Sequence, residues 1–407
     1  MILKDTLKNI ARLQREELEK QEIGVPRELL NSLDSGSSHA VIISGIRRCG
    51  KSTLLRQFMR KLKNYYYFNF EDPRLIGFEV SDFEKLDAVL KEVYGQSKYY
   101  FFDEVQNVLG WERFVRKMQD ASKKFFITGS NASLLSKELG TKLTGRHISY
   151  ELFPFSFAEM LDLRKIKPSL DSFNDYFGQG GFPEYLKYGN DAMLQQIFKD
   201  IINRDVVVRH KLRNSKLVEQ LAFYLLSNSG KEFSHNQLKK MFNVGSTNTM
   251  TTYVSFFEDS YLIFTIPKFD YSYKKQLVNP KKIYAIDIGL AKTNSVSFSE
   301  DKGRTLENIV FLHLRRKHKD IYYFKGKNEC DFLVKEKGKI TEAYQVCYDL
   351  TEENKERELA GLKEAMETFK LKIGVIVTLK QKDKLDNIKV VPAWEWVLTT
   401  DQHDAFA

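Results

Sequence analysis

The chain has 407 residues, a formal net charge of +10 and 42% hydrophobic residues. This length is typical of two or three domains, and this composition is typical of a globular protein. No apolar run approaches the ~18 residues that a membrane span needs. Charged residues interrupt the stretch 1–20 throughout, so we predict neither a membrane protein nor a signal peptide.

The net charge indicates the kind of partner, and the cysteines indicate the cellular compartment. An excess of positive charge suits an anionic partner such as nucleic acid. Cys49, Cys330 and Cys347 are far apart and show no C-x-x-C spacing. They indicate reduced thiols in a cytoplasmic protein rather than a disulfide framework or a zinc site.

Strands and helices alternate in the first 155 residues. We expect a helix over 4–34, and then strands at 40–45, 65–70, 98–104, 124–130 and 147–153. The helices between these strands are expected at 52–62, 81–94, 111–121 and 132–139. Five apolar strands separated by helices predict a parallel α/β sheet covered on both faces.

After residue 155 this alternation stops. We expect mainly helices over 156–210, then three helices over 216–262 and a strand-rich stretch to 287, an order typical of a winged helix. A helix and four strands, near 321–324, 330–335, 341–348 and 373–378, with a charged helix at 351–369, predict a second small α/β domain. The predicted domains are 1–155, 156–290 and 291–407.

A phosphate-binding loop follows the first strand. Gly45-Ile-Arg-Arg-Cys-Gly50-Lys51-Ser52 matches G-x-x-x-x-G-K-[ST] between a strand and a helix. Its backbone N–H groups can cradle phosphates, Lys51 can reach the β- and γ-phosphates, and Ser52 can ligate Mg²⁺. We predict that ATP is bound here, the alternative being a plain glycine turn. The expected ATP contacts are Gly45, Arg47, Arg48, Cys49, Gly50, Lys51, Ser52 and Thr53.

Two acids end the third strand, in Tyr99-Tyr-Phe-Phe-Asp103-Glu104. A P-loop needs an acid at a neighbouring strand end to hold Mg²⁺, and Asp103 suits that role beside Ser52. Glu104 can polarise the attacking water as a general base. Two solvated acids at a strand end are the alternative, which the preceding P-loop disfavours.

Two further polar positions complete the predicted catalytic set. Ser130, in Thr128-Gly-Ser130-Asn131, can contact the γ-phosphate or the attacking water, or else cap the next helix. Arg146, in Leu143-Thr-Gly-Arg146, can neutralise charge on the γ-phosphate as an arginine finger does, or else lie on the surface. The predicted catalytic residues are therefore Glu104, Arg146 and Ser130.

These elements together resemble the AAA+ and STAND ATPases. More specifically, the segments GIRRCGKSTLL, FFDEVQ, FITGSNASLLS, LTGR, LFPFSFAEM and GGFPEYL resemble a prokaryotic ATPase family. Its members join an AAA-type core to a winged helix and a C-terminal restriction-endonuclease-like domain. The resemblance implies a core sheet ordered 5-1-4-3-2 and spans nearly the whole chain.

The winged helix is a candidate for binding double-stranded DNA. Small polar side chains on its likely recognition helix suit groove contacts: Ser246, Thr247, Asn248, Thr249, Thr251 and Thr252. Lysines with two tyrosines mark the expected wing: Lys268, Lys274, Lys275, Lys281 and Lys282, with Tyr271 and Tyr273. The alternative is a packing or switch module. The net basic charge favours nucleic acid.

The endonuclease resemblance implies a metal held by Glu307, Asp331 and Gln345. Cys347 stands where such folds place a lysine, and a thiol near neutral pH is mostly uncharged. The nearest lysines, Lys335, Lys337 and Lys339, lie at the preceding turn. We therefore expect an inactive nuclease fold that serves in binding or assembly.

These features together predict an ATPase that switches conformation on a nucleic-acid or protein partner and works as a homo-oligomer. One alternative is an ATP-regulated, metal-dependent nuclease. Another is a signalling switch of the STAND type, which holds ATP with little turnover.

Overall fold

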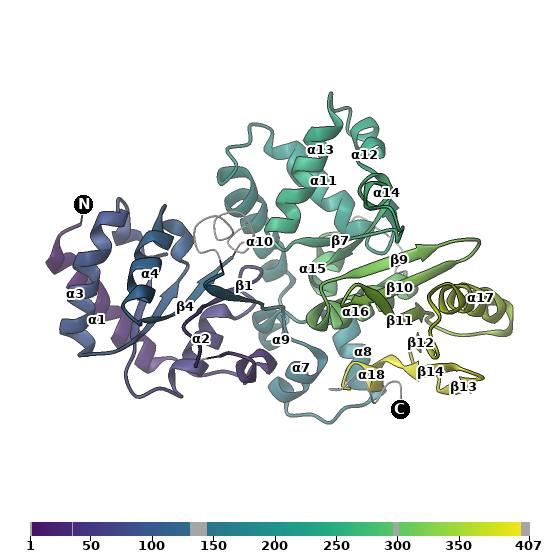
Figure 1. Ribbon diagram of the computed structural model, residues 1–407, viewed down its shortest axis with the longest axis horizontal. Coiled ribbons are helices and arrows are strands. Elements are labelled where there is room, and N and C mark those ends of the chain that lie inside the picture. Colours follow the sequence, from purple (N-terminus) through teal and green to yellow (C-terminus); the bar gives the residue numbers. More distant parts are fainter. Residues whose placement is uncertain (1, 35, 131–144, 296–300, 400–407) are drawn as a thin grey trace. The chain divides into compact units, whose positions relative to one another are not determined.

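The computed structural model describes the chain apart from residues 1, 35, 131–144, 296–300 and 400–407. The chain divides into two compact units, 1–153 and 154–407, which are described separately (Figure 1). Across the described residues, no helix combines the length and the apolar character needed to cross a membrane. The expected helix at 132–139 and Asn131 lie outside the described residues.

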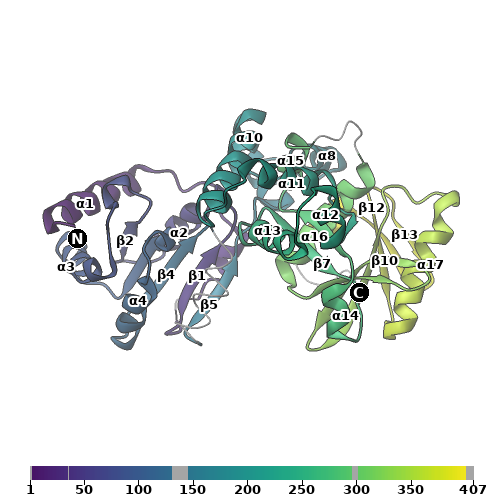
Figure 2. The same cartoon turned by 90° about the horizontal axis from the view of Figure 1, so that it is seen from above.

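The first unit contains a five-stranded sheet in which every pairing is parallel. Its strands are β1 (Ala40–Ser44), β2 (Tyr66–Asn69), β3 (Tyr99–Asp103), β4 (Lys124–Gly129) and β5 (His147–Glu151). Their order, β2-β3-β4-β1-β5, confirms the expected 5-1-4-3-2 arrangement (Figure 2). The P-loop strand β1 therefore lies inside the sheet, between β4 and β5, and all five of its residues are buried.

Helices cover both faces of this sheet. They are α1 (Lys4–Lys20), α2 (Lys51–Met59), α3 (Phe83–Tyr94) and α4 (Trp111–Asp120), with short 3₁₀ turns at Glu28–Asn31, Pro73–Leu75, Val80–Asp82 and Val105–Asn107. Tyr100 and Phe102 of β3 pack in the core that α1, α3 and α4 share. Phe101, between them, faces Phe58 of α2, because successive strand side chains point to opposite faces.

The N-terminal helix is shorter than the sequence predicted. It ends at Lys20 rather than near residue 34. Gly24 adopts a left-handed φ of 67°, and Pro26 lacks the N–H that a helix would use. The backbone is already extended at Gln21, directly after Lys20, and Gly24 and Pro26 oppose a return to helix further along.

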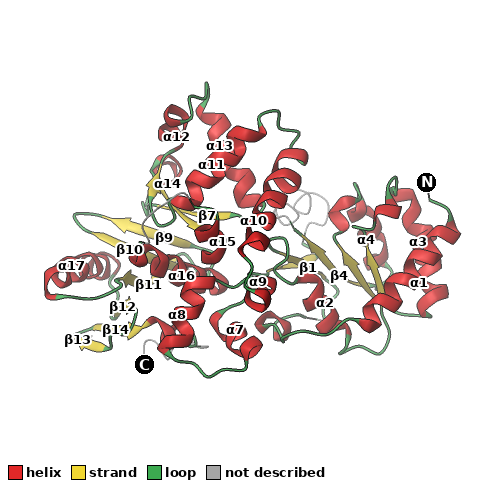
Figure 3. Cartoon of the chain, turned by 180° about the vertical axis from the view of Figure 1, so that it is seen from behind, coloured by secondary structure: helices red, strands yellow, loops and turns green. Residues whose placement is uncertain are grey.

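The second unit begins with helices, coloured red in Figure 3. They are α7 (Phe157–Arg164), α8 (Leu170–Gln179), α9 (Pro183–Tyr188), α10 (Asp191–Asp200) and a π-helix (Ile201–Val208). Buried Asp287 connects this region to α15 (Ile288–Thr293), because its carboxylate accepts from the N–H groups of Gly181 at 2.6 Å and Leu290 at 2.8 Å. Burial raises the pKa of Asp287 to about 6.

A three-helix segment and a small antiparallel sheet follow. The helices are α11 (Ser215–Ser227), α12 (His235–Met241) and α13 (Thr247–Asp259), and the sheet order is β6 (Glu232–Phe233), β8 (Lys281–Ala285), β7 (Ile263–Pro267). The strand-rich stretch expected to residue 287 also contains a helix, α14 (Tyr273–Val278). Its residues Leu277 and Val278 are 54% and 72% exposed.

The chain ends in a six-stranded mixed sheet ordered β13-β14-β12-β11-β10-β9. The strands are β9 (Ile321–Lys325), β10 (Glu329–Glu336), β11 (Lys339–Val346), β12 (Gly374–Thr378), β13 (Asp383–Leu385) and β14 (Ile388–Pro392). The helices are α16 (Lys302–Lys317), α17 (Glu352–Phe369) and the short α18 (Ala393–Trp396). The last two strands and α18 were not foreseen, since their segments are only three to five residues long.

Candidate functional site

The loop between β1 and α2 has a backbone conformation that few side chains tolerate. Gly50 has a φ of 101° and Arg48 of 63°, both in the left-handed region. A Cβ on Gly45 would lie 2.1 Å from the carbonyl oxygen of Leu152, so glycine is required there. Left-handed residues in such a loop turn N–H groups toward one side, which forms a concavity for an anion.

Lys51 is the buried cation of this loop. It is 4% exposed and stands at the first position of α2. Its Nζ donates hydrogen bonds to the carbonyl oxygens of Gly45 and Ile46, both at 3.1 Å. The nearest Glu104 oxygen is 3.7 Å away, beyond good hydrogen-bond range. Its hydrogen bonds go to neutral carbonyls, and its ion pair with Glu104 is long, so the ammonium can still bind an anionic ligand.

Asp103 ends β3 with 1% of its surface exposed. Its carboxylate accepts hydrogen bonds from the hydroxyls of Ser52, Thr128 and Tyr67, the last at 3.2 Å. Burial raises the pKa of Asp103, and the charge of Glu104 adds to the rise. Ser52 and Asp103 thus lie together and offer the hard oxygen donors that Mg²⁺ prefers.

Glu104 follows with a strained backbone. Its φ of 52° is left-handed although it is not glycine, a conformation that costs energy and gathers at functional sites. Its N–H donates to the Thr128 hydroxyl at 3.1 Å, and its side chain accepts from Gln106. Thr128 therefore supports both acids, since it donates to one and accepts from the backbone of the other.

Ser130 lies just beyond β4 and is 1% exposed. Within the described part of the chain, its hydroxyl has no hydrogen-bond partner. A buried, unsatisfied hydroxyl two residues after Thr128 is consistent with a ligand contact, but its role stays a prediction.

The remaining loop residues differ in their surroundings. Arg47 forms an ion pair with Glu71 at 3.0 Å, whereas Arg48 is exposed. Cys49 is buried, which raises the pKa of its thiol, so it contributes packing and its backbone rather than a reactive sulfur. The hydroxyl of Thr53 accepts from Arg56 at 3.0 Å.

Arg27 supports the loop from outside the motif and was missed by the sequence reasoning. It is 3% exposed. Its guanidinium donates to the carbonyl oxygens of Cys49 and Phe153, each at 2.7 Å. It lies 22 residues before Cys49, and no pattern marked it. Thr128 had a signal, because a polar residue ends an otherwise apolar strand.

Arg146 is not brought to the P-loop of its own unit. It precedes β5, and its carbonyl oxygen accepts from the N–H of Ala40, the first residue of β1. The loop leaves the other end of β1, after Ser44. The Arg146 side chain forms an ion pair with Asp120 on the surface. An action on the nucleotide of a neighbouring subunit stays a prediction.

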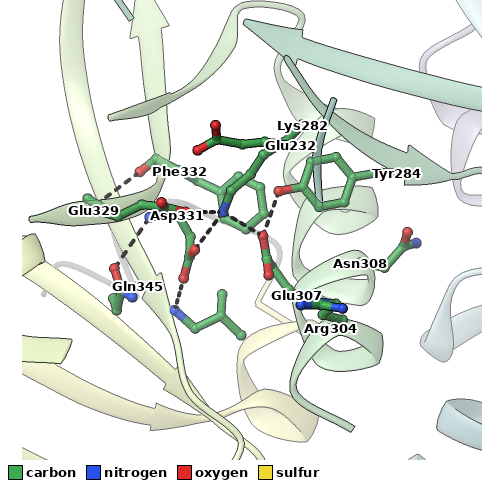
Figure 4. A network of polar contacts seen from close by, with 12 residues as sticks. Glu232, Lys282, Tyr284, Arg304, Glu307, Asn308, Glu329, Asp331, Phe332 and Gln345 are labelled. Atoms are coloured by element: carbon green, nitrogen blue, oxygen red, sulfur yellow. Dashed lines mark hydrogen bonds and ion pairs between the residues drawn. The ribbon is translucent and has the colours of Figure 1, made fainter. Parts of the chain in front are cut away.

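A second polar cluster lies in the second unit (Figure 4). The Nζ of Lys282, on β8, contacts Glu307 of α16 at 3.0 Å, Asp331 of β10 at 2.9 Å and Glu329 of β10 at 2.8 Å. Lys282 is 4% exposed. Burial alone would lower its pKa, but the charge of Asp331 and the other acids raises that pKa well above the usual value. Its expected place in a DNA-binding wing is wrong, because it faces buried acids.

The other residues of the expected metal site lie at the edge of this cluster. Gln345 accepts from the N–H of Asp331 at 3.3 Å and donates to Glu358 at 2.7 Å. Burial raises the pKa of Cys347 to about 11, and its thiol donates to the Asp349 carbonyl at 3.1 Å. Cys347 is therefore a neutral packing residue that supplies no cation.

Residues 37–161 match a family model described as an AAA domain. Residues 170–300 and 302–396 match two models described as domains of unknown function. The uncharacterized protein MJ1544 of Methanocaldococcus jannaschii is 36% identical over 396 residues, covering 88% of each chain. An uncharacterized protein of Haemophilus influenzae is 27% identical over 383 residues, covering 88% of this chain and 94% of that one.

Similar solved structures are much more distant. The Aeropyrum pernix ORC1 protein in complex with DNA is 11% identical with a TM-score of 0.30, covering 72% of this chain and 92% of that one. AMPPCP-bound DnaA from Aquifex aeolicus is 14% identical with a TM-score of 0.30, covering 61% of this chain and 88% of that one.

Proposed function

Because this chain belongs to the family of the uncharacterized protein MJ1544 and carries an AAA domain, we propose that it binds ATP with Mg²⁺ and hydrolyses it. The observation that carries the proposal is the state of Lys51. It is a buried ammonium held by two neutral carbonyls, beside a loop whose left-handed residues expose N–H groups. Such an arrangement is best completed by a polyanion.

The residues of the P-loop would bind the triphosphate. Loop N–H groups and the uncapped start of α2 would face the phosphates, and Lys51 would exchange its carbonyl contacts for β- and γ-phosphate oxygens. Ser52 and Asp103 would hold Mg²⁺, which neutralises charge on the bridging and terminal phosphates when bound.

Glu104 would orient the attacking water and accept its proton. The strained backbone of Glu104 and the bond from its N–H to Thr128 fix the base relative to Asp103. This fixed geometry supports turnover over passive retention of ATP, because a base must be held within reach of the water before the reaction.

The experiment on nucleotide binding compares Lys51→Ala with Lys63→Ala, an exposed lysine just after the same helix. We expect Lys51→Ala to lose most of its affinity for ATP, because charge-assisted contacts to phosphate are the strong ones. The control should bind as the wild type does in calorimetry. Unchanged affinity of Lys51→Ala would place the nucleotide elsewhere.

A role for Arg146 in a neighbouring subunit makes the proposed working form a homo-oligomer. The position of Arg146 at the amino end of β5, opposite the loop, supports an action between subunits rather than within one. The buried, unpaired Cys49, Cys330 and Cys347 support a reducing compartment such as the cytoplasm.

Double-stranded DNA is the second proposed ligand, through α13 and α14. The arrangement of α11, α12, α13 and the sheet β6-β8-β7 supports a winged helix. On α13 the small polar residues Asn248, Thr251 and Thr252 are exposed. Lys274 and Lys275 are exposed on α14 beside Tyr273, which is 72% exposed. Exposed cations and aromatic rings on one short segment suit a phosphate backbone.

A further inference from the structure

The carboxylates of the C-terminal unit are gathered as a metal site would gather them. Glu307 and Asp331 come from different elements, a helix and a strand, and converge with Gln345 nearby (Figure 4). The endonuclease resemblance implies a divalent metal at this point. The metal can be accommodated only if the oxygens that face the centre of the cluster are free to bind it.

Those oxygens are already used by a side chain. The ammonium of Lys282 has three N–H groups and three carboxylate neighbours, one each from Glu307, Glu329 and Asp331, at 2.8–3.0 Å. A divalent metal bonds to oxygen at roughly 2.0–2.6 Å. It would have to occupy the volume in which the Lys282 nitrogen lies.

The same acids also have further partners. The Tyr284 hydroxyl donates at 2.7 Å to the same Oε1 of Glu307 that faces Lys282, and the N–H of Val346 donates to the second oxygen of Asp331 at 3.0 Å. Lys325 makes a further ion pair with Glu329 at 3.4 Å. Among the described residues, no group of acids, histidines or cysteines is arranged to hold a metal ion.

We infer that Lys282 is the resident cation of this cluster and replaces the divalent metal that the endonuclease resemblance implies. The cluster then serves as a metal-independent junction between two sheets of the second unit. Lys282 lies on β8 of the three-stranded sheet, whereas two of its acids lie on β10 of the six-stranded sheet. A buried ammonium bonded to three carboxylates holds them together without an ion from solution.

The inference is tested by measuring Mn²⁺ binding to the full chain without nucleotide, so that the P-loop does not contribute a site. Calorimetry and Mn²⁺ electron paramagnetic resonance should detect no Asp331-dependent site in the wild type. Lys282→Met removes the charge and keeps the length of the side chain. This variant should gain an Mn²⁺ site, and Mn²⁺ should raise its melting temperature while leaving that of the wild type unchanged.

Two variants identify the source of any gain. Lys281→Met alters the neighbouring, half-exposed lysine of β8 and should behave as the wild type. Lys282→Met combined with Asp331→Asn should lose the new site, because a bridging carboxylate is gone. A Lys282→Met variant that folds but gains no site would overturn the inference that the ammonium occupies a metal position.

The wild type decides the question if Lys282→Met does not fold. Mn²⁺ binding to the wild type that disappears in Asp331→Asn would show that Lys282 and the metal coexist, which contradicts the replacement. Equal Mn²⁺ titrations of the wild type and Asp331→Asn would support the inference, as would recovery of folded Lys282→Met when it is refolded in Mn²⁺.

Discussion

Lys51 and Lys282 are both 4% exposed, yet their surroundings are opposite. Lys51 donates to two neutral carbonyls and has one carboxylate, that of Glu104, at 3.7 Å, whereas Lys282 contacts three carboxylates at 2.8–3.0 Å. Burying a charge is costly unless it is compensated. The first unit therefore keeps a cation that a ligand can compensate, and the second keeps a cation that the protein has already compensated. Equal burial thus indicates opposite functions.

This comparison predicts different effects for substitutions at the two lysines. Changes around the P-loop should alter ATP binding and turnover with little loss of stability. Changes around Lys282 should alter stability and leave nucleotide chemistry intact. The tests below run from the largest expected effect to the smallest.

Arg146 tests whether the first unit completes its site with a second copy. Arg146→Ala should lower ATP turnover by ~10³–10⁵-fold, because an arginine finger contributes that much. Wild-type turnover per subunit should rise with protein concentration. Mixing Arg146→Ala with Lys51→Ala should restore activity, since each copy supplies what the other lacks. Arg116→Ala, on the exposed side of α4, is the control. Turnover that is independent of concentration, from a monomer, would refute the action between subunits.

Glu104→Gln separates binding from hydrolysis within the same unit. The amide keeps the shape of the side chain but cannot accept a proton from water. We expect turnover to fall by ~10²–10⁴-fold with ATP affinity nearly unchanged, measured by phosphate release and calorimetry. Glu84→Gln, exposed on α3, should be silent in both. Wild-type turnover in Glu104→Gln would remove Glu104 as the base.

Replacing Lys51 or Lys282 by alanine compares the stability of the two units directly. Lys282→Ala should lower the free energy of unfolding by about 3–5 kcal/mol, because buried Asp331, largely buried Glu307 and partly exposed Glu329 lose their shared cation. Lys51→Ala should cost about 1 kcal/mol or less, since two hydrogen bonds to neutral groups are lost. Urea unfolding followed by tryptophan fluorescence reports on both, with Trp111 in the first unit and Trp394 and Trp396 in the second. Equal losses of unfolding free energy in Lys51→Ala and Lys282→Ala would contradict the proposed difference between the two lysines.

Asp287 extends the comparison to a buried acid. Its carboxylate is held by backbone N–H groups rather than by a lysine. Its pKa in the folded chain, about 6, lies above the usual value for aspartate. Its contribution to stability is therefore fully present below pH ~4 and is lost as the pH rises through about 6. Between pH 4 and pH 7.5, the free energy of unfolding of the wild type should fall by about 2 kcal/mol relative to that of Asp287→Asn. Asp171→Asn, exposed on α8, should show no such trend in urea unfolding at each pH.

The exposed lysines of α14 should give the smallest effect. Neutralising Lys274 and Lys275 together should weaken duplex DNA binding and reduce the slope of log K against log salt by about two, one for each lost phosphate contact. Fluorescence anisotropy at several salt concentrations measures this slope. Neutralising Lys370 and Lys372, exposed after α17, is the matched control. Failure of the wild type to retain any duplex at low salt would leave this region as a packing module.

The sequence predicted those features of the site that depend on residues close together in the chain. The P-loop spans Gly45 to Ser52, and both its glycines have the backbone or the close approach that requires glycine. Asp103 was singled out because an acid directly ends an apolar strand. The sheet order, which the family resemblance implied, was confirmed. Local spacing and strand ends were enough for the P-loop and Asp103.

The parts that it missed depend on residues far apart in the chain. Lys282 meets Asp331 across 49 positions, and Arg27 meets Phe153 across 126. A lysine in a basic stretch looks like a surface residue until the fold places acids around it. Arg146 is a different case, because its place directly before the expected strand at 147–153 already indicated the amino edge of a parallel sheet, opposite the P-loop.

The contacts of Arg27 have a consequence for how the first unit could transmit force. One planar guanidinium joins the carbonyl of Cys49, within the P-loop, to the carbonyl of Phe153, where the unit ends. The preceding residue is tied as well, because the N–H of Leu152 donates to Ser44 at 2.7 Å and its carbonyl accepts from the thiol of Cys49 at 3.4 Å. The last residues of the first unit, Leu152 and Phe153, are therefore hydrogen-bonded to the P-loop or to the arginine that supports it. A change in the backbone of the loop at Cys49 would therefore have to be accommodated by the hydrogen bonds that hold Leu152 and Phe153.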